Sequence, residues 1–196
     1  FILPGQLGFS ILITGIFGTA FVFLSLRETL VIKRFFATPI NRKFIVLGEG
    51  ISRLIFSISG AAIIILIGYF FFDFTLIDGF STFINMLVIS TLGLTVFLGF
   101  GFMVSNVANS INSVPPIANL LSLPQFLLAG TFFPIDNFPA WLQPISRALP
   151  LTYLNVALRK IAFDGANIFM LHTEILVLLG WGIVIYTLAI IFFRWE

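Results

Sequence analysis

Residues 80–104 read FSTFINMLVISTLGLTVFLGFGFMV, and no charged side chain interrupts this run. A helix rises 1.5 Å per residue, so about 20 apolar residues cross the roughly 30 Å hydrocarbon core of a bilayer. A transmembrane β-strand would instead show about 10 residues of alternating polarity. The run therefore predicts a membrane-spanning α-helix, and it sets the fold class of the chain.

Four further stretches have the same apolar character. They cover approximately residues 5–26, 54–72, 117–133 and 173–193. The stretch 117–133 is the shortest, and Pro124 inside it predicts a kink or a break. The sequence thus predicts an all-α integral membrane protein with five transmembrane helices.

The composition supports a membrane protein. The 196-residue chain is 59% hydrophobic and 9% charged, with a mean hydropathy of +1.14, whereas a soluble domain carries about 25% charged residues. The net charge of +2 and the lack of an extended basic face argue against a nucleic-acid partner. The chain has no cysteine, which excludes disulfides and thiolate metal sites. It begins at Phe1 within an apolar stretch, and we expect an N-terminal segment of the full protein to be missing.

The basic residues predict the orientation. Six of the ten lie in one segment: Arg27, Lys33, Arg34, Arg42, Lys43 and Arg53. Cytoplasmic loops are enriched in Lys and Arg, so this segment is expected inside the cell. Alternation of the helices then places 73–79 and 134–172 outside and 105–116 inside. The cations Arg147, Arg159 and Lys160 in the outer segment oppose this orientation, but the first basic segment is the stronger signal.

The basic segment itself, RETLVIKRFFATPINRKFIVLGEG at 27–50, is amphipathic. A helix is predicted from Glu28 to Ala37, because Pro39 disfavours helix at the residue before it. A second helix is predicted to begin at Arg42. The pattern fits a helix that contacts another protein, and it equally fits an interfacial helix attracted to anionic lipid.

A second unusual segment is PIDNFPAWLQPISRALPLTYLNVALRKIAFDG at 134–165. It contains four prolines, which divide it into pieces too short to span the membrane: Pro134, Pro139, Pro144 and Pro150. Leu142 adds apolar surface, Trp141 and Tyr153 suit a membrane interface, and a helix is predicted from Thr152 to Asp164 with Gly165 as its C-terminal cap. We expect a pair of short helices that dips into the outer leaflet. The alternative is a surface loop with one amphipathic helix.

Within the predicted spans, ionisable residues are absent from the middle, which argues against an ion-coupled carrier. Polar residues remain there: Thr14, Thr19, Ser57, Ser59, Asn85, Ser90, Thr91, Thr95, Asn119 and Gln125. We expect most of them to form hydrogen bonds between helices and not to line a path. Gly93, Gly99 and Gly101 allow close approach of helices. His172 is expected to be a residue at a span boundary.

The two unusual segments resemble permeases of the ABC-2 family of ABC transporters. The first carries RET-x-x-x-KR-x-x-ATP-x-x-R at Arg27–Arg42, and the second LAGTFFPIDNFPAWLQPISRALPLTYLNVALR at Leu128–Arg159. The resemblance covers essentially the whole chain, residues 1–196, as one transmembrane domain containing spans two to six of a six-span subunit. Leu30 departs from the glycine that many members have after Glu-Thr.

The resemblance implies a role for each segment. Residues 27–44 would be a cytoplasmic coupling segment bound to a separate ATP-binding cassette subunit. Its contact residues would be Glu28, Lys33, Arg34, Pro39 and Arg42. Residues 134–165 would form a re-entrant, extracytoplasmic hairpin. The hairpin residues would include Pro134, Pro139, Trp141, Leu142, Pro150 and Tyr153.

The sequence has no G-x-x-x-x-G-K-[ST] loop, so ATP and Mg²⁺ are expected on the partner subunit and no cofactor is expected in this chain. The implied function is transport without enzymatic activity of its own, as a subunit that exports a lipophilic, amphipathic or glycan-type substrate. A second permease subunit, identical or homologous, would complete the complex in a bacterial or archaeal inner or plasma membrane. An ATP-independent channel or carrier and a non-transporting scaffold are the alternatives.

Overall fold

A computed structural model of the chain describes residues 2–28, 42–72 and 74–191. In this part of the chain all regular secondary structure is helical, as the sequence predicts. The elements are α1 (Ile2–Ile13), η1 (Thr14–Gly18), α2 (Thr19–Glu28), α4 (Arg42–Phe71), α5 (Phe80–Val107), η2 (Ile111–Ser113), α6 (Val114–Leu128), η3 (Ile135–Asn137), α7 (Gln143–Ala148), α8 (Pro150–Asp164), η4 (Ile168–Met170) and α9 (His172–Ile191).

Four helical segments in the described ranges are long and apolar enough to cross a membrane. They are Ile2–Leu26, Gly50–Phe71, Phe80–Val107 and His172–Ile191. The first combines α1, η1 and α2 into one continuous span. These segments correspond to four of the five predicted stretches, because long apolar runs leave no other structure that satisfies the backbone in lipid.

The fifth predicted stretch, 117–133, differs from its prediction. The helix here is α6, which has 15 residues and is about 22 Å long at 1.5 Å per residue. It continues through Pro124, so the predicted break is absent. The predicted end at Phe133 was wrong, since α6 ends at Leu128 and Gly130 follows with a φ of 69°. A left-handed glycine of this kind terminates a helix.

The central helix is α5, which packs against α1, η1, α2, α4, α8 and α9. Its three glycines face three different neighbours. A side chain at Gly93 would meet Leu154 of α8, and one at Gly99 would meet Ile185 of α9. At Gly101, a Cβ atom would lie 2.7 Å from the carbonyl oxygen of Gly15 in η1. The predicted close approach at these glycines is confirmed: Gly93 and Gly99 make room for side chains of neighbouring helices, and Gly101 allows direct backbone contact.

The polar side chains within the spans bond mostly to their own helix. Ser59, Thr91 and Thr95 each donate to the carbonyl four residues earlier, at 2.8–2.9 Å. Bonds between spans come from other residues: Asn106 Nδ2 donates to the Ala189 carbonyl at 2.9 Å. For those three hydroxyls, the prediction of bonds between helices was therefore wrong. A hydroxyl can always reach a carbonyl of the preceding turn, whereas a bond to another helix needs a suitably placed partner.

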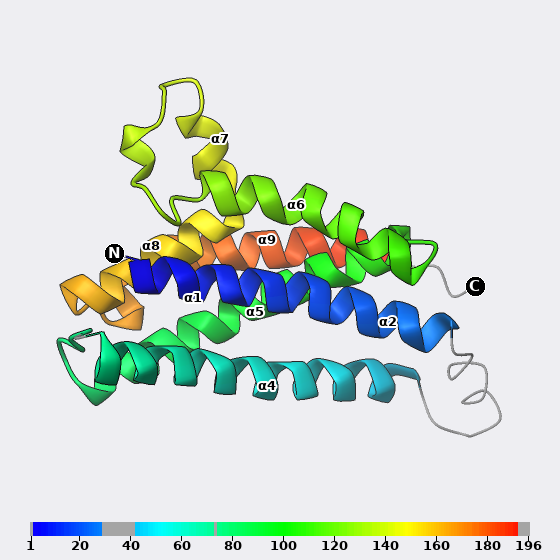
Figure 1. Cartoon of the computed structure of the whole chain (residues 1–196), viewed down its shortest axis with the longest axis horizontal. Helices are drawn as coiled ribbons and strands as arrows, with labels where there is room; N and C mark the ends of the chain where they lie inside the picture. Colours follow the sequence, from blue (N-terminus) through cyan, green and yellow to red (C-terminus); the bar gives the residue numbers. More distant parts are fainter. Residues whose placement is uncertain (1, 29–41, 73, 192–196) are drawn as a thin grey trace.

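The bundle has two distinct ends (Figure 1). At one end lie the start of α1, the turn between α4 and α5, and the whole segment from the end of α6 to the start of α9. At the opposite end lie the end of α2, the start of α4 and the turn between α5 and α6. The predicted up-and-down alternation is therefore confirmed for these helices. Which end faces the cytoplasm stays a prediction.

Candidate functional site

The second helix of the predicted hairpin is α8. It begins at Pro150, two residues before the predicted start, because proline is well suited to the first turn of a helix. Gly165 ends it with a φ of 61°, as predicted. Its fully buried side chains are Leu151, Leu154, Asn155, Ala157, Leu158 and Ile161. α8 is therefore a core helix among α1, α5 and α9, and the alternative of an amphipathic surface helix is wrong for this part of the segment.

Two polar residues of α8 hold the turn that follows α6. Asn155 Nδ2 donates to the Ala129 carbonyl at 3.1 Å and to Thr131 Oγ1 at 3.2 Å. Arg159 Nη2 donates to the carbonyls of Gly130 and Thr131, at 3.2 Å for Thr131. These bonds satisfy carbonyls that the end of α6 leaves without helical partners. They attach α8 to the end of α6.

Burial lowers the pKa of the Arg159 guanidinium below its ordinary value. The ordinary pKa of arginine is so high that the group still carries its charge at physiological pH. A charged donor to a carbonyl forms a stronger hydrogen bond than a neutral one. Arg159 is one of the three cations that oppose the predicted orientation, and it thus has a structural role in closing the turn.

Two glycines of α1 complete this junction. A side chain at Gly5 would collide with the carbonyl oxygen of Thr131, and one at Gly8 would collide with Oδ1 of Asn155. Only glycine allows a helix backbone to approach another element this closely. The first span is therefore packed directly onto both the turn and α8.

A partly buried ion pair joins α8 to α9. Lys160 Nζ lies 2.7 Å from Glu174 Oε1, with side-chain exposures of 44% and 7%. Glu174 is in the first turn of α9, where a negative charge interacts favourably with the helix dipole. Farther along α9, Trp181 Nε1 donates to the Ala148 carbonyl at 3.1 Å. The base of the hairpin is thus attached to the last span at two points.

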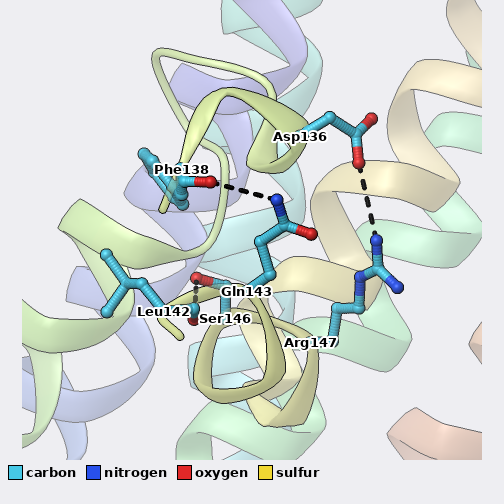
Figure 2. Close-up of polar contacts among 6 residues, drawn as sticks. All are labelled: Asp136, Phe138, Leu142, Gln143, Ser146 and Arg147. Carbon is cyan, nitrogen blue, oxygen red and sulfur yellow. Dashed lines mark hydrogen bonds and ion pairs between the residues drawn. The ribbon is translucent and has the colours of Figure 1, made fainter. Parts of the chain in front are cut away.

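The other half of the hairpin projects from the bundle (Figure 1). We call residues 132–148 the cap. Figure 2 shows its polar contacts: Arg147 Nη2 lies 3.5 Å from Asp136 Oδ1, and Gln143 Nε2 donates to the Phe138 carbonyl at 3.0 Å. Ser146 Oγ donates to the Leu142 carbonyl at 3.2 Å. The cap also contacts its neighbours, because Thr152 Oγ1 of α8 donates to the Ser146 carbonyl and the ring of Phe132 packs against Phe126 of α6. The exposed ion pair adds little stability.

The six predicted hairpin residues fall into two groups. Pro134, Pro139 and Trp141 are exposed on the cap, with Trp141 71% exposed. Leu142 is half-buried at the start of α7. The remaining two belong to α8, where Pro150 is buried and Tyr153 packs against the core. The structure does not bring the six together into one site.

The coupling residues lie largely outside the described part of the chain. Lys33, Arg34 and Pro39 fall in 29–41, outside the described residues. Glu28 is the last residue of α2 and Arg42 the first of α4, so a helix beginning at Arg42 is confirmed. The contacts of all five predicted coupling residues lie outside what the structure describes. Both boundaries of 29–41 nevertheless lie at the end of the bundle opposite the cap (Figure 1).

Sequence reasoning missed the polar contacts that organise this end. Lys160 was considered only as a cation of the outer segment, and its pairing with Glu174 was not predicted. Asn155 was not singled out at all. The available signal was its position between apolar residues, because an amide at such a position needs buried partners.

These helices and junctions define the class of the molecule as an all-α integral membrane protein. The sequence model of the ABC-2 type transporter family matches residues 1–163, and the chain belongs to this family. The chain is 23% identical over 142 residues to the probable multidrug ABC transporter permease YbhR of Escherichia coli K12, and equally to that of strain O157:H7. The match covers 72% of this chain and 38% of each relative. No solved structure matches the chain.

Proposed function

We propose that the chain is part of the membrane permease of an ATP-driven exporter. The observation that carries the proposal is the family match over residues 1–163, which includes both unusual segments nearly in full. The relatives' printed name, a probable multidrug ABC transporter permease, supports the same class of function. The ATPase would be a separate subunit, and a second permease subunit would complete the complex.

The two ends of the bundle would have different roles in transport. Segment 27–44 would bind the ATP-binding subunit through Glu28, Lys33, Arg34 and Arg42, with Pro39 setting the turn between its helices. A short charged helix transmits a rigid-body movement better than a loose loop does. The hairpin lies at the opposite end, which is where an exported substrate would leave (Figure 1).

The proposed substrate is lipophilic, amphipathic or glycan-like. The interior of the bundle is formed mainly by apolar side chains, including Leu12, Ile16, Met86 and Phe97. A small anion would need cationic or dipolar groups on its path. Uptake of a fluorescent amphipathic cation and of chloride into vesicles containing the complex would compare these classes. Transport of chloride alone would contradict the proposal on substrate class.

The proposed function is tested by purifying the full-length protein in detergent with its candidate ATP-binding subunit. Charge reversal at Glu28 and Arg34 (Glu28→Lys and Arg34→Glu) is expected to break the complex or to uncouple its ATPase activity. Charge reversal at Arg147, on the cap, is the matched control and should leave the complex intact. Failure of the unaltered protein to bind an ATPase would contradict the proposal and favour an ATP-independent channel or a scaffold.

A further inference from the structure

The first span contains an irregularity that the sequence did not predict. Between α1 and α2, residues Thr14–Gly18 form the π-helix η1. The flanking residues Ile13 and Thr19 both have right-handed helical conformations, so the span remains helical on either side. π-helical turns are rare, occur frequently at functional sites, and are among the few places where a helix bends sharply.

At η1 the first span meets the central helix backbone to backbone. A Cβ atom at Gly15 would lie 2.6 Å from Cβ of Phe97. A Cβ atom at Gly101 would lie 2.7 and 2.8 Å from the carbonyl oxygens of Gly15 and Ile16. The closest atoms at these glycines are backbone atoms and the Cβ atoms of Phe97 and Thr19, so the first span and α5 are in direct contact here. Such a contact is suited to act as a pivot.

A cationic side chain from a third helix also reaches η1. The Nη1 atom of Arg53 lies 3.1 Å from the position of a Cβ atom at Gly18. Arg53 belongs to α4, within the candidate span Gly50–Phe71. Arg53 lies near the start of this span, where a long cationic side chain can still reach the membrane interface. Its guanidinium lies next to Gly18 and thus brings α4 into contact with the irregular turn.

The two halves of the first span have different attachments. α1 is packed onto the turn and α8 through Gly5 and Gly8. α2 packs mainly against α5 and ends at Glu28, immediately before residues 29–41. α4 begins at Arg42, immediately after them. The two helices that border the proposed coupling segment thus converge on η1 through Gly18 and Arg53.

We propose that η1 is a hinge at which α2 pivots relative to α1, and that Arg53 positions this hinge according to the position of α4. The proposal rests on the proposed function in one respect, because the ATP-binding subunit would supply the movement. Movement of α2 against α5 would bend the first span at η1, while α1 and α8 stay together as one body.

The test uses the full-length permease with its ATP-binding subunit in nanodiscs. Two cysteines are introduced at a time and spin-labelled, and the distance between the two labels is measured. The pair Leu26→Cys and Ile190→Cys reports on α2, since both sites lie toward the proposed coupling end. The pair Ile2→Cys and Phe169→Cys reports on the hairpin end. Distances are compared without nucleotide and with ATP and vanadate. The first pair is expected to change its distance, and the second is expected to keep it.

The hinge variant is Gly18→Ala, which favours a regular α-helix and meets only the movable end of Arg53. The matched control is Gly60→Ala in α4, where a Cβ atom meets no atom within 4 Å. Gly18→Ala should lose most of the distance change and most of the ATP-driven transport, and Gly60→Ala should lose neither. An equal distance change in both variants, or none in the active unaltered complex, would overturn the hinge.

The permease alone separates this proposal from the proposed function. In the absence of any ATPase, the distance distribution of the Leu26–Ile190 pair should be broad, and Gly18→Ala should narrow it while Gly60→Ala leaves it broad. If the permease binds no ATPase but Gly18→Ala still narrows the distribution, the proposed function is contradicted and the hinge proposal stands. Equal widths in the unaltered protein and Gly18→Ala would overturn the hinge, whether or not an ATPase binds.

Discussion

The two halves of the hairpin are packed in opposite ways, although they are adjacent in the sequence and both lie at the same end of the bundle (Figure 1). α8 is buried on most sides and is attached to α1, to the turn after α6 and to α9. The cap, residues 132–148, projects away from the bundle and carries exposed apolar residues such as Phe133 and Trp141. Within one segment, α8 is therefore a structural junction, whereas the adjacent cap is an exposed surface.

This difference shows where sequence changes will be tolerated. At the α8 junction, polar atoms are removed from water and depend on single partners, so the loss of one partner leaves another buried without a bond. On the exposed part of the cap, which excludes the buried Ser146, water replaces a lost contact. We expect the stability of the protein to depend on α8, and the cap to be free to vary for contacts with lipid or substrate.

The largest effect is expected for Gly5→Ala. The added methyl group would collide with the Thr131 carbonyl, a backbone atom that Arg159 also holds in place. Overpacking of this kind lowers the free energy of unfolding by about 1–3 kcal/mol or more. It should therefore lower the thermal unfolding midpoint measured in one chosen detergent. Gly60→Ala is the control, because its methyl group meets no atom within 4 Å. Similar midpoints for the two variants would contradict the close packing of α1 onto the turn.

Asn155→Leu should have the next largest effect. The substitution keeps the branched shape and the number of side-chain heavy atoms but removes the donor to Ala129 and Thr131. A buried acceptor left without a partner costs about 1–3 kcal/mol, which thermal unfolding would detect. Asn85→Leu is the comparison, since its bond to Asn167 is exposed. A midpoint for Asn155→Leu no lower than that for Asn85→Leu would show that the α8 junction does not depend on this amide.

The ion pair between α8 and α9 should show a smaller, non-additive effect. Lys160→Met removes the partner of a buried carboxylate and should destabilise the protein by about 2 kcal/mol, less than for a fully buried pair because Lys160 is partly exposed. The double variant Lys160→Met with Glu174→Leu should be more stable than the single one, because no charge is left buried. Equal losses of stability in the single and double variants would show that the carboxylate of Glu174 does not depend on Lys160. The unfolding midpoints of these two variants and of the unaltered protein provide the measurement.

The smallest effect is expected on the cap. Replacing the exposed pair by Asp136→Asn and Arg147→Gln should change stability by less than about 1 kcal/mol. Trp141→Ala should leave the unfolding midpoint unchanged, because its side chain is 71% exposed. If either change lowered the midpoint as far as Asn155→Leu does, the contrast between the cap and α8 would be wrong.

The spans were predictable because a continuous apolar run such as 80–104 admits only a helix in lipid. The C-terminal cap at Gly165 was predictable for a local reason, its place after a helical pattern. The end of α6, the burial of α8 and the Lys160–Glu174 pair were not. Each depends on which helices become neighbours, and in a chain this apolar the pattern of a single helix does not distinguish lipid from protein as its surroundings.

The π-helix η1 shows the same limitation. Residues 14–18 read TGIFG, and two glycines in a membrane span are common enough to predict nothing special. The irregular turn becomes visible only with Phe97 and Gly101 of α5 packed against it. Local propensity permits the turn here, and the packing between helices explains its position.

The central claim is that the proposed coupling segment and the cap lie on opposite sides of a cell membrane. Lys33→Cys and Trp141→Cys are each introduced singly into the full-length protein, with any cysteine outside these 196 residues replaced, and intact cells are treated with a membrane-impermeant maleimide. We predict labelling of Trp141→Cys in intact cells and labelling of Lys33→Cys only after lysis. Labelling of both in intact cells, or of Lys33→Cys alone, would contradict the account.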